Sequence, residues 1–198
     1  MAYLPVAQET TWQQSDSIDL AKTAVLVVDA LGGSNPVLPV LEEMMSNSAA
    51  ITKAARAAGV PVVFVDDAHI PGLDRELELW GEHGIVDTED AQPAAALEPC
   101  ASDYIIPKRR YDGFFQTDLD LTLRELGVDT LIVVGADTNI CVLQTLAGAY
   151  FRGYKTVVAA DATATFLIGT QEYALDYFSR CYDSRVVDTA RVLAYLAD

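Results

Sequence analysis

An aspartate, a lysine and a cysteine each follow a separate hydrophobic run of this 198-residue chain. Asp29 ends the run TAVLVVD, Lys108 ends DYIIPK, and Cys141 lies just beyond TLIVVG and a Gly-Ala-Asp-Thr-Asn turn. A cysteine at a helix N-terminus has its thiolate stabilised by free N–H groups, and a nearby ammonium lowers its pKa further. An aspartate beside the thiol can take its proton and later deliver it to a leaving nitrogen. These residue types predict a cysteine nucleophile.

Each residue also has an ordinary structural interpretation. Free cysteine is among the most buried residue types, an aspartate after a strand is commonly a helix N-cap, and a basic run such as KRR at 108–110 is commonly solvated. The functional interpretation depends on all three residues following strands, because ligands bind at the carboxyl ends of parallel strands. Backbone N–H groups of the turn before Cys141 could also stabilise an oxyanion, at a few kcal/mol per donor.

Hydrophobic periodicity predicts the elements that must position these residues. The expected strands are residues 23–29, 60–67, 103–108, 130–135, 155–161 and 184–188, and the expected helices are 38–58, 118–126, 140–152, 170–182 and a last one from 189. Strands that alternate with helices form a parallel sheet covered on both faces. The predicted fold is therefore α/β, a three-layer Rossmann-like fold with a six-stranded, mostly parallel sheet flanked by helices.

The chain is expected to hold one domain. Residues 1–20 are predicted to be a polar N-terminal lead-in, and residues 21–198 the globular domain. Residues 68–102 contain three prolines and three glycines with weak periodicity, which predicts a long functional loop or lid. The only two histidines, His69 and His83, lie in that segment.

Composition excludes several classes of function. The net charge of -16 makes nucleic-acid binding unlikely to be the function, because phosphate contacts need clustered cations. No apolar run approaches the ~20 residues of a membrane span, and the first residues lack a signal-peptide pattern, so a cytoplasmic protein without membrane contact is predicted. Scarce lysine with abundant aspartate fits a halophilic source and an ordinary acidic protein equally. The three cysteines lack CxxC spacing, so neither a disulfide framework nor a thiolate zinc site is expected.

Three stretches of the sequence resemble the isochorismatase-like cysteine hydrolases, which include nicotinamidases and N-carbamoylsarcosine amidases. They are AVLVVDA around Asp29, the segment 107–142 (PKRRYDGFFQTDLDLTLRELGVDTLIVVGADTNICV), and YKTVVAADAT after it. The resemblance runs from about Thr23 to about Asp188, so residues 21–198 are predicted to form an isochorismatase-like hydrolase domain.

The resemblance implies specific roles. Asp29, Lys108 and Cys141 match the catalytic triad, and the backbone N–H groups of Asp137 and Cys141 match the oxyanion hole, with a cis peptide bond between Ala136 and Asp137. No cofactor is required for the covalent step. The family is usually dimeric or tetrameric, so a homo-oligomer is expected.

The segment DDAHIPGLDRELELWGEHGI is similar to the metal site of nicotinamidases, in which an Asp and two His bind zinc or iron. Asp67, His69 and His83 fall on those positions, and hydrogen bonding within the loop is the alternative for both histidines. Trp80, Phe114 and Phe115 are candidates for aromatic walls of the substrate site, although any of them could equally be core. All three are predicted to bind substrate.

Two departures from the nicotinamidase pattern affect the expected substrate. The residues after the first strand, 29–34, lack the usual glutamine and aromatic, and DAHIPGLD lacks the Trp-His-Pro signature. The segment DAHIPGLDRELELWGEHGI, followed later by KRRYDGFF, more closely resembles the N-carbamoylsarcosine amidase branch of the family. The predicted activity is a cysteine amidohydrolase that cleaves the C–N bond of a small amide or ureido substrate through a thioester, with release of ammonia. The alternatives are a nicotinamidase, a non-covalent isochorismatase-type hydrolase and a catalytically silent binding subunit.

Overall fold

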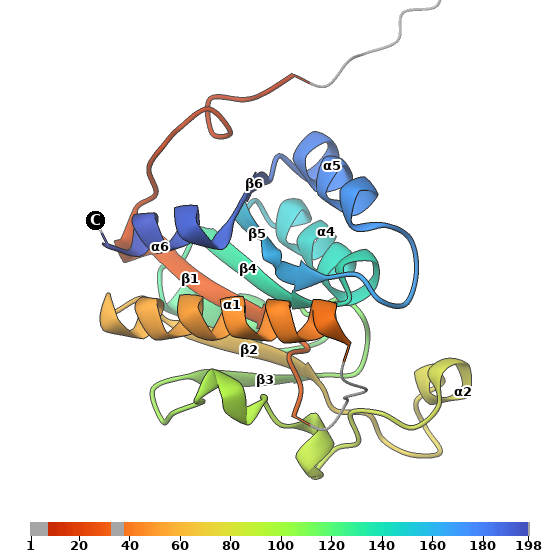
Figure 1. Cartoon of the computed structure of the whole chain (residues 1–198). Helices are drawn as coiled ribbons and strands as arrows, with labels where there is room; N and C mark the ends of the chain where they lie inside the picture. The colour runs from red at the N-terminus through yellow and green to blue at the C-terminus, as the bar shows by residue number, and fades with distance from the viewer. Residues whose placement is uncertain (1–7, 33–37, 198) are drawn as a thin grey trace, which may run out of the picture.

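Residues 8–32 and 38–197 are described by the computed structural model, and in them six parallel strands form one sheet (Figure 1). The strands are β1 (Thr23–Val28), β2 (Val62–Asp67), β3 (Tyr104–Lys108), β4 (Thr130–Ala136), β5 (Lys155–Ala164) and β6 (Arg185–Val187). Their order across the sheet is β3-β2-β1-β4-β5-β6, and every pair of neighbours is parallel. The predicted α/β fold is confirmed, and the sheet is wholly rather than mostly parallel.

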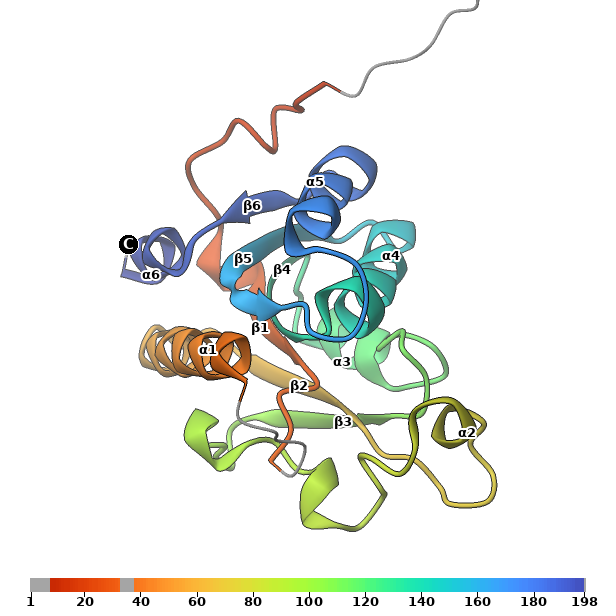
Figure 2. The same cartoon turned by 45° about the vertical axis from the view of Figure 1, so that its right-hand side comes forward.

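Helices cover both faces of the sheet. Helices α1 (Pro39–Ala57) and α6 (Thr189–Ala197) lie on one face, and α3 (Leu119–Glu125), α4 (Leu143–Phe151) and α5 (Gln171–Tyr182) lie on the other (Figure 2). Successive side chains of β1 alternate between the two cores, because Leu26 packs with the α3–α5 side and Val27 with the α1–α6 side. Burying each such side chain contributes about 1.5–3 kcal/mol. The near-continuous apolar strands of the sequence thus reflect burial on both faces.

A change of direction in the strand order lies between β1 and β4. The chain adds β2 and then β3 on one side of β1, and returns to place β4 on its other side. Strand ends at such a switch point form the ligand crevice of doubly wound sheets. Gly135 permits close approach here, since its φ is +117° and a Cβ would lie 1.9 Å from the carbonyl oxygen of Val28.

The segment 68–102 is more structured than the sequence predicted. It holds the short helix α2 (Glu76–Trp80) and two 3-10 turns, Glu89–Ala91 and Ala95–Leu97. An isolated bridge also pairs His69 with Ile85. The turn 95–97 packs against α1, where the carbonyl oxygen of Leu97 accepts a hydrogen bond from Arg56. Nε2 of His69 and Nε2 of His83 lie 3.5 and 3.9 Å from the carboxylate of Asp67, the last residue of β2, so both histidines lie at the end of that strand.

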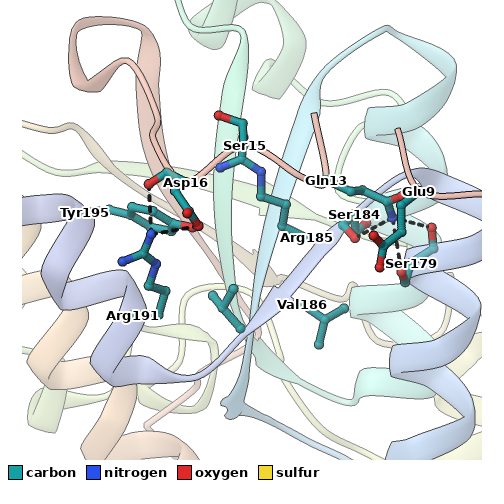
Figure 3. Close-up of a pocket in the computed structure, with 11 residues that line it drawn as sticks. Glu9, Gln13, Ser15, Asp16, Ser179, Ser184, Arg185, Val186, Arg191 and Tyr195 are labelled. Carbon is teal, nitrogen blue, oxygen red and sulfur yellow. Dashed lines mark hydrogen bonds and ion pairs between the residues drawn. The ribbon is translucent and has the colours of Figure 1, made fainter. Parts of the chain in front are cut away.

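The N-terminal lead-in packs against the β6 edge of the sheet. The Arg185 guanidinium lies 3.5 Å from the ring centroid of Trp12 and donates hydrogen bonds to the carbonyl oxygens of Trp12 and Ser17, at 2.6 and 3.0 Å. Figure 3 shows the pocket between this segment, β6 and α6, with Arg191 paired to Asp16. Residues 1–7 of the predicted lead-in lie outside the described residues. None of the helices that the structure describes is long and apolar enough to cross a membrane.

Candidate active site

Lys108 is the centre of the site at the strand ends. Its side chain is buried, with the residue 1% exposed, and its Nζ atom lies 2.7 Å from Oδ2 of Asp29 and 2.5 Å from Oδ1 of Asp67. The same Nζ lies 3.6 Å from Sγ of Cys141. The backbone N–H of Asp67 donates to Oδ1 of Asp29 at 2.8 Å. The structure thus brings the three predicted catalytic residues together, and Asp67 joins them.

Four neighbouring strands supply these four side chains. Asp29 follows β1 in a left-handed conformation, with a φ of 47°, and Asp67 and Lys108 are the last residues of β2 and β3. Cys141 comes from the turn after β4. Because β1 and β4 flank the switch point, the site occupies the crevice expected for this sheet.

Cys141 lies in a π-helical turn, Thr138–Val142, that leads directly into α4. Asp137 precedes this turn, and its side chain accepts a hydrogen bond from the backbone N–H of Asn139. The peptide bond between Ala136 and Asp137 is cis, as predicted. π-Helical turns occur frequently at functional sites. The oxyanion role of the Asp137 and Cys141 amides stays a prediction.

Burial changes the proton affinities of the site. It raises the pKa of Asp29 to about 6, with the Asp67 charge adding to the effect and Lys108 opposing it. Burial also raises the pKa of the Cys141 thiol, although Lys108 acts to lower it. The expectation of a lowered thiol pKa was therefore wrong, because desolvation outweighs the ammonium. Cys141 at rest keeps its proton, and Asp29 titrates near neutral pH where it can accept one.

The three residues predicted to bind a metal also converge. One ligand atom each from Asp67, His69 and His83 lies within 4.8 Å of the other two. His69 is fully buried, and neither of its ring nitrogens has a hydrogen-bond partner among the residues that the structure describes. Two imidazoles and a carboxylate form a donor set suited to Zn²⁺ or Fe²⁺. The residues therefore fit the implied ion, and metal binding itself stays a prediction.

Two acidic residues beside His69 were missed in the sequence. Oε2 of Glu76 lies 3.8 Å from Nε2 of His69 and has no hydrogen-bond partner in the described part of the chain. Oδ2 of Asp74 lies 3.6 Å from Nδ1 of His69. Asp74 also pairs with Arg109 at 2.6 Å and Arg110 at 3.2 Å. The basic run is therefore anchored, rather than freely solvated. Acidic residues are so common in this sequence that no local signal distinguished these two.

The predicted aromatic walls have different outcomes. Phe114 has the alternative position in the core, where it is 3% exposed and stacks on Tyr154 at a centroid distance of 5.6 Å. Trp80 is partly exposed at the end of α2 and donates from Nε1 to the hydroxyl of Tyr111 at 2.8 Å. Phe115 is exposed. Trp80 and Phe115 stay predictions, and of the departures after β1, residues 33 and 34 lie outside the described residues.

Asp66 and Asp161 lie at the ends of two of the predicted strands, where an aspartate is commonly a helix cap. Asp161 has this role, because its Oδ1 accepts from the backbone N–H and the hydroxyl of Thr189 at the start of α6. Asp66 does not, since both of its carboxylate oxygens are buried without a hydrogen-bond partner in residues 8–32 and 38–197. Burial and the nearby charge of Asp29 raise its pKa well above the ordinary value. Both effects favour the protonated form of the Asp66 carboxyl group.

Comparison with known proteins adds independent findings. The model of the Isochorismatase domain matches residues 18–191. Ureidoacrylate amidohydrolase RutB of Serratia proteamaculans (strain 568) is 32% identical over 140 residues, which are 61% of this chain and 56% of the relative. The matched segment thus spans little more than half of that relative.

Two solved structures extend the likeness to the fold. N-carbamoylsarcosine amidase from Thermoplasma acidophilum superposes with a TM-score of 0.78 at 33% identity, covering 85% of this chain and 96% of that one. Nicotinamidase PncA from Bacillus subtilis has a TM-score of 0.76 at 28% identity, covering 84% and 99% of the two chains.

Proposed function

The chain belongs to the isochorismatase family, and on that premise we propose that it is a cysteine amidohydrolase that cleaves the C–N bond of a small amide or ureido substrate. The observation that carries the proposal is the position of Lys108, whose Nζ lies 2.7 Å from the Asp29 carboxylate and 3.6 Å from the Cys141 sulfur. A base, a cation and a nucleophile thereby meet in a buried crevice. Among the relatives, an N-carbamoylsarcosine amidase and a ureidoacrylate amidohydrolase support hydrolysis of such bonds.

The reaction begins with proton transfer. The Asp29 carboxylate takes the proton of the Cys141 thiol, and the thiolate forms a bond to the carbonyl carbon of the substrate. Lys108 stabilises the thiolate that appears at this moment. The backbone N–H groups of Asp137 and Cys141 are assigned to the oxyanion of the tetrahedral intermediate. A raised pKa suits Asp29 to this exchange, because a general base works best with a pKa near the working pH.

The remaining steps return the enzyme to its starting state. Asp29, now protonated, delivers its proton to the leaving nitrogen, so that the C–N bond breaks and ammonia departs from a thioester. Asp29 then takes a proton from water, whose oxygen attacks the thioester carbon. The C–S bond breaks, the acid product leaves, and the proton returns to the sulfur. Each atom and proton is accounted for without a cofactor in the covalent step.

A metal ion is compatible with this scheme. Asp67, His69 and His83 would hold Zn²⁺ or Fe²⁺, and such an ion orients substrate or polarises its oxygen when bound. Oδ1 of Asp67 also contacts Lys108, while its Oδ2 lies 3.9 Å from Nε2 of His83. The carboxylate of Asp67 therefore links the two clusters.

The metal cluster favours nicotinamidase as the second candidate. Asp67, His69 and His83 converge, as the resemblance to the metal site of nicotinamidases implies. A nicotinamidase also has the same fold, at 28% identity. A non-covalent hydrolase is less well supported, because it leaves the placement of Cys141 against Lys108 unused. The protein is expected to act on small molecules as a homo-oligomer, a dimer or tetramer, in the cytoplasm.

Ammonia release tests the proposal. The full-length protein is assayed with N-carbamoylsarcosine, ureidoacrylate and nicotinamide, at low and high salt, beside Cys141→Ala. We expect release from one of these compounds and none from the variant. Release that persists in the variant contradicts the covalent mechanism. If neither protein releases ammonia from any of the compounds, and mass spectrometry finds no thioester, the binding-subunit alternative is favoured.

A further inference from the structure

The side chain of Asp137 holds two separate segments together. Its Oδ1 accepts from the backbone N–H of Asn139 at 2.8 Å, and its Oδ2 accepts from the backbone N–H groups of Phe166 and Leu167 at 2.8 and 2.9 Å. The residue is 4% exposed. Hydrogen bonds to an ionised acceptor are about twice as strong as neutral ones. One oxygen therefore binds the turn that carries Cys141, and the other binds the connection between β5 and α5.

Asn139 reinforces the same junction. Its Nδ2 donates to the hydroxyl of Thr165 at 3.0 Å and to the carbonyl of Thr170 at 3.3 Å. A Cβ at Gly169 would lie 2.9 Å from Cγ of Asn139, so the backbone of the connection directly abuts this side chain. Figures 1 and 2 both show the β5–α5 connection beside the start of α4. Residues 165–170 are thus fixed to the cysteine turn from both ends.

The connection carries apolar side chains at the ligand edge of the sheet. Phe166, Leu167 and Ile168 are 38%, 51% and 59% exposed, beyond the carboxyl end of β5 and next to the turn that follows β4. Such exposure is costly for three consecutive apolar residues unless something covers them. The backbone N–H groups of the first two nevertheless donate hydrogen bonds to Asp137.

We propose that the Asp137 carboxylate is a positioning residue for amide hydrolysis, which fixes the Cys141 turn relative to residues 165–170. The inference concerns the side chain, not the backbone amide, and it rests on the function proposed above. Loss of the Oδ1 bond frees the start of the turn, which displaces the sulfur from Lys108 and Asp29. Loss of the Oδ2 bonds frees residues 165–170. A displacement of about 1 Å at a reacting group can cost about a hundredfold in rate.

The test compares Asp137→Ala and Asp137→Asn with Asp161→Ala. Asp161 is a matched control, because its carboxylate also accepts a backbone N–H, from Thr189 at 2.7 Å, but it faces α6. Each full-length protein is characterised by its melting temperature and by hydrogen exchange of the peptide covering 165–170. We also measure the alkylation rate of Cys141 by iodoacetamide, together with kcat and KM.

Both alanine variants are expected to melt a few degrees lower than the wild type. Only Asp137→Ala should speed exchange in 165–170, by at least about tenfold, and lower both kcat and Cys141 alkylation by about ten- to a hundredfold. Asp137→Asn keeps the size of the side chain and one acceptor oxygen, so it should fold even if the alanine variant does not. Its decreases in kcat and in Cys141 alkylation should lie between those of the wild type and of Asp137→Ala. A merely structural role predicts that Asp137→Ala behaves like Asp161→Ala.

The readouts separate this proposal from the proposed function. If the wild type releases no ammonia from any amide, exchange and alkylation still decide the role of Asp137. Alkylation as fast as in the wild type, or unchanged exchange in 165–170, overturns the inference. Activity that is lost in Cys141→Ala but kept in both Asp137 variants also overturns it, and leaves the proposed function standing.

Discussion

The Nζ atom of Lys108 lies 2.7 Å from Oδ2 of Asp29, and both side chains are enclosed at the switch point of the sheet. Asp67 contacts the same ammonium at 2.5 Å, so one cation stands between two carboxylates. The Asp67 pKa falls to about 2 despite its burial, because Lys108 stabilises its charge. Asp67 therefore stays ionised at neutral pH. Asp29, whose pKa rises to about 6, is the carboxylate of the pair that can exchange a proton.

Replacing Lys108 by Met removes the ammonium group that contacts both of these carboxylates. Removing one partner of a buried ion pair destabilises a protein by about 3–5 kcal/mol. We expect a loss of that size in the free energy of unfolding, measured with urea at pH 7, together with loss of amide hydrolysis. Lys53→Met, at an exposed position on α1, is the control and should change stability by less than about 0.5 kcal/mol. Equal effects of the two substitutions contradict the assignment.

The pH dependence of kcat/KM is expected to follow Asp29. Asp29 acts as a base only when it has lost its proton, and half of it has done so near pH 6. The rate should therefore fall about tenfold for each unit below pH 6 and level off above it. Rates are measured from pH 4.5 to 8, with unfolding followed at each pH. If kcat/KM stays constant down to pH 5, Asp29 does not have this role. The same holds if kcat/KM of an Asp29→Asn variant still falls below pH 6.

Cys141→Ala should lower amide hydrolysis by at least about a thousandfold, because no other nucleophile takes its place. Its fold should be kept, since the change removes one sulfur atom from a helix that the rest of the core holds. Ammonia release and circular dichroism check both points. Cys181→Ala, at an exposed cysteine of α5, serves as the control and should leave the rate unchanged. Trapping of a thioester mass on Cys141 would support the same conclusion directly.

Zinc is expected to stabilise the protein through Asp67, His69 and His83. A ligand that binds only the folded state at a hundred times its Kd adds about 2.7 kcal/mol. Melting of metal-free protein is followed as zinc is added, and metal content is counted by mass spectrometry. His83→Gln should abolish the shift, while Glu78→Gln, exposed on α2, should preserve it. The same shift in both variants contradicts the site.

The strands and the convergence of Asp29, Lys108 and Cys141 could be predicted because their signals are local. Val25 and Val27 belong to a continuous apolar run whose length and flanks define a doubly buried strand, and Asp29 follows it directly. Parallel pairing then brings the strand ends to one edge. The lead-in was read only as polar, since nothing in its own composition reveals that Trp12 stacks under Arg185, about 170 residues later in the chain.

Predictions within loops were weaker for a physical reason. Phe114 and Phe115 are adjacent, yet one is buried in the core and the other is exposed. A loop has no fixed periodicity, so the sequence does not tell which of two neighbouring rings faces inward. Likewise Glu76 and Glu78 look alike in the sequence, and only the position of α2 beside His69 separates them. The thiol pKa was mispredicted because the extent of burial is a tertiary property.

Asp66→Asn should be more stable than the wild type, by an amount that grows as the pH rises. Burial, followed by the charge of Asp29, raises the pKa of Asp66 in the folded state, so the folded chain holds a proton that the unfolded chain loses near pH 4. The stability that this protonated group contributes is present below pH 4 and is lost as the pH rises toward the folded pKa. Asparagine has no such loss, because it cannot ionise.

The difference in the free energy of unfolding between Asp66→Asn and wild type should therefore grow from pH 4 upward, by about 1.4 kcal/mol for each unit by which the pKa is raised. It should level off above the folded pKa, where both states of the wild type are ionised. Urea unfolding at pH 4 to 8 measures it, with the exposed Asp90→Asn as the control. A difference that does not change with pH would show that Asp66 ionises in the folded state as easily as in the unfolded chain.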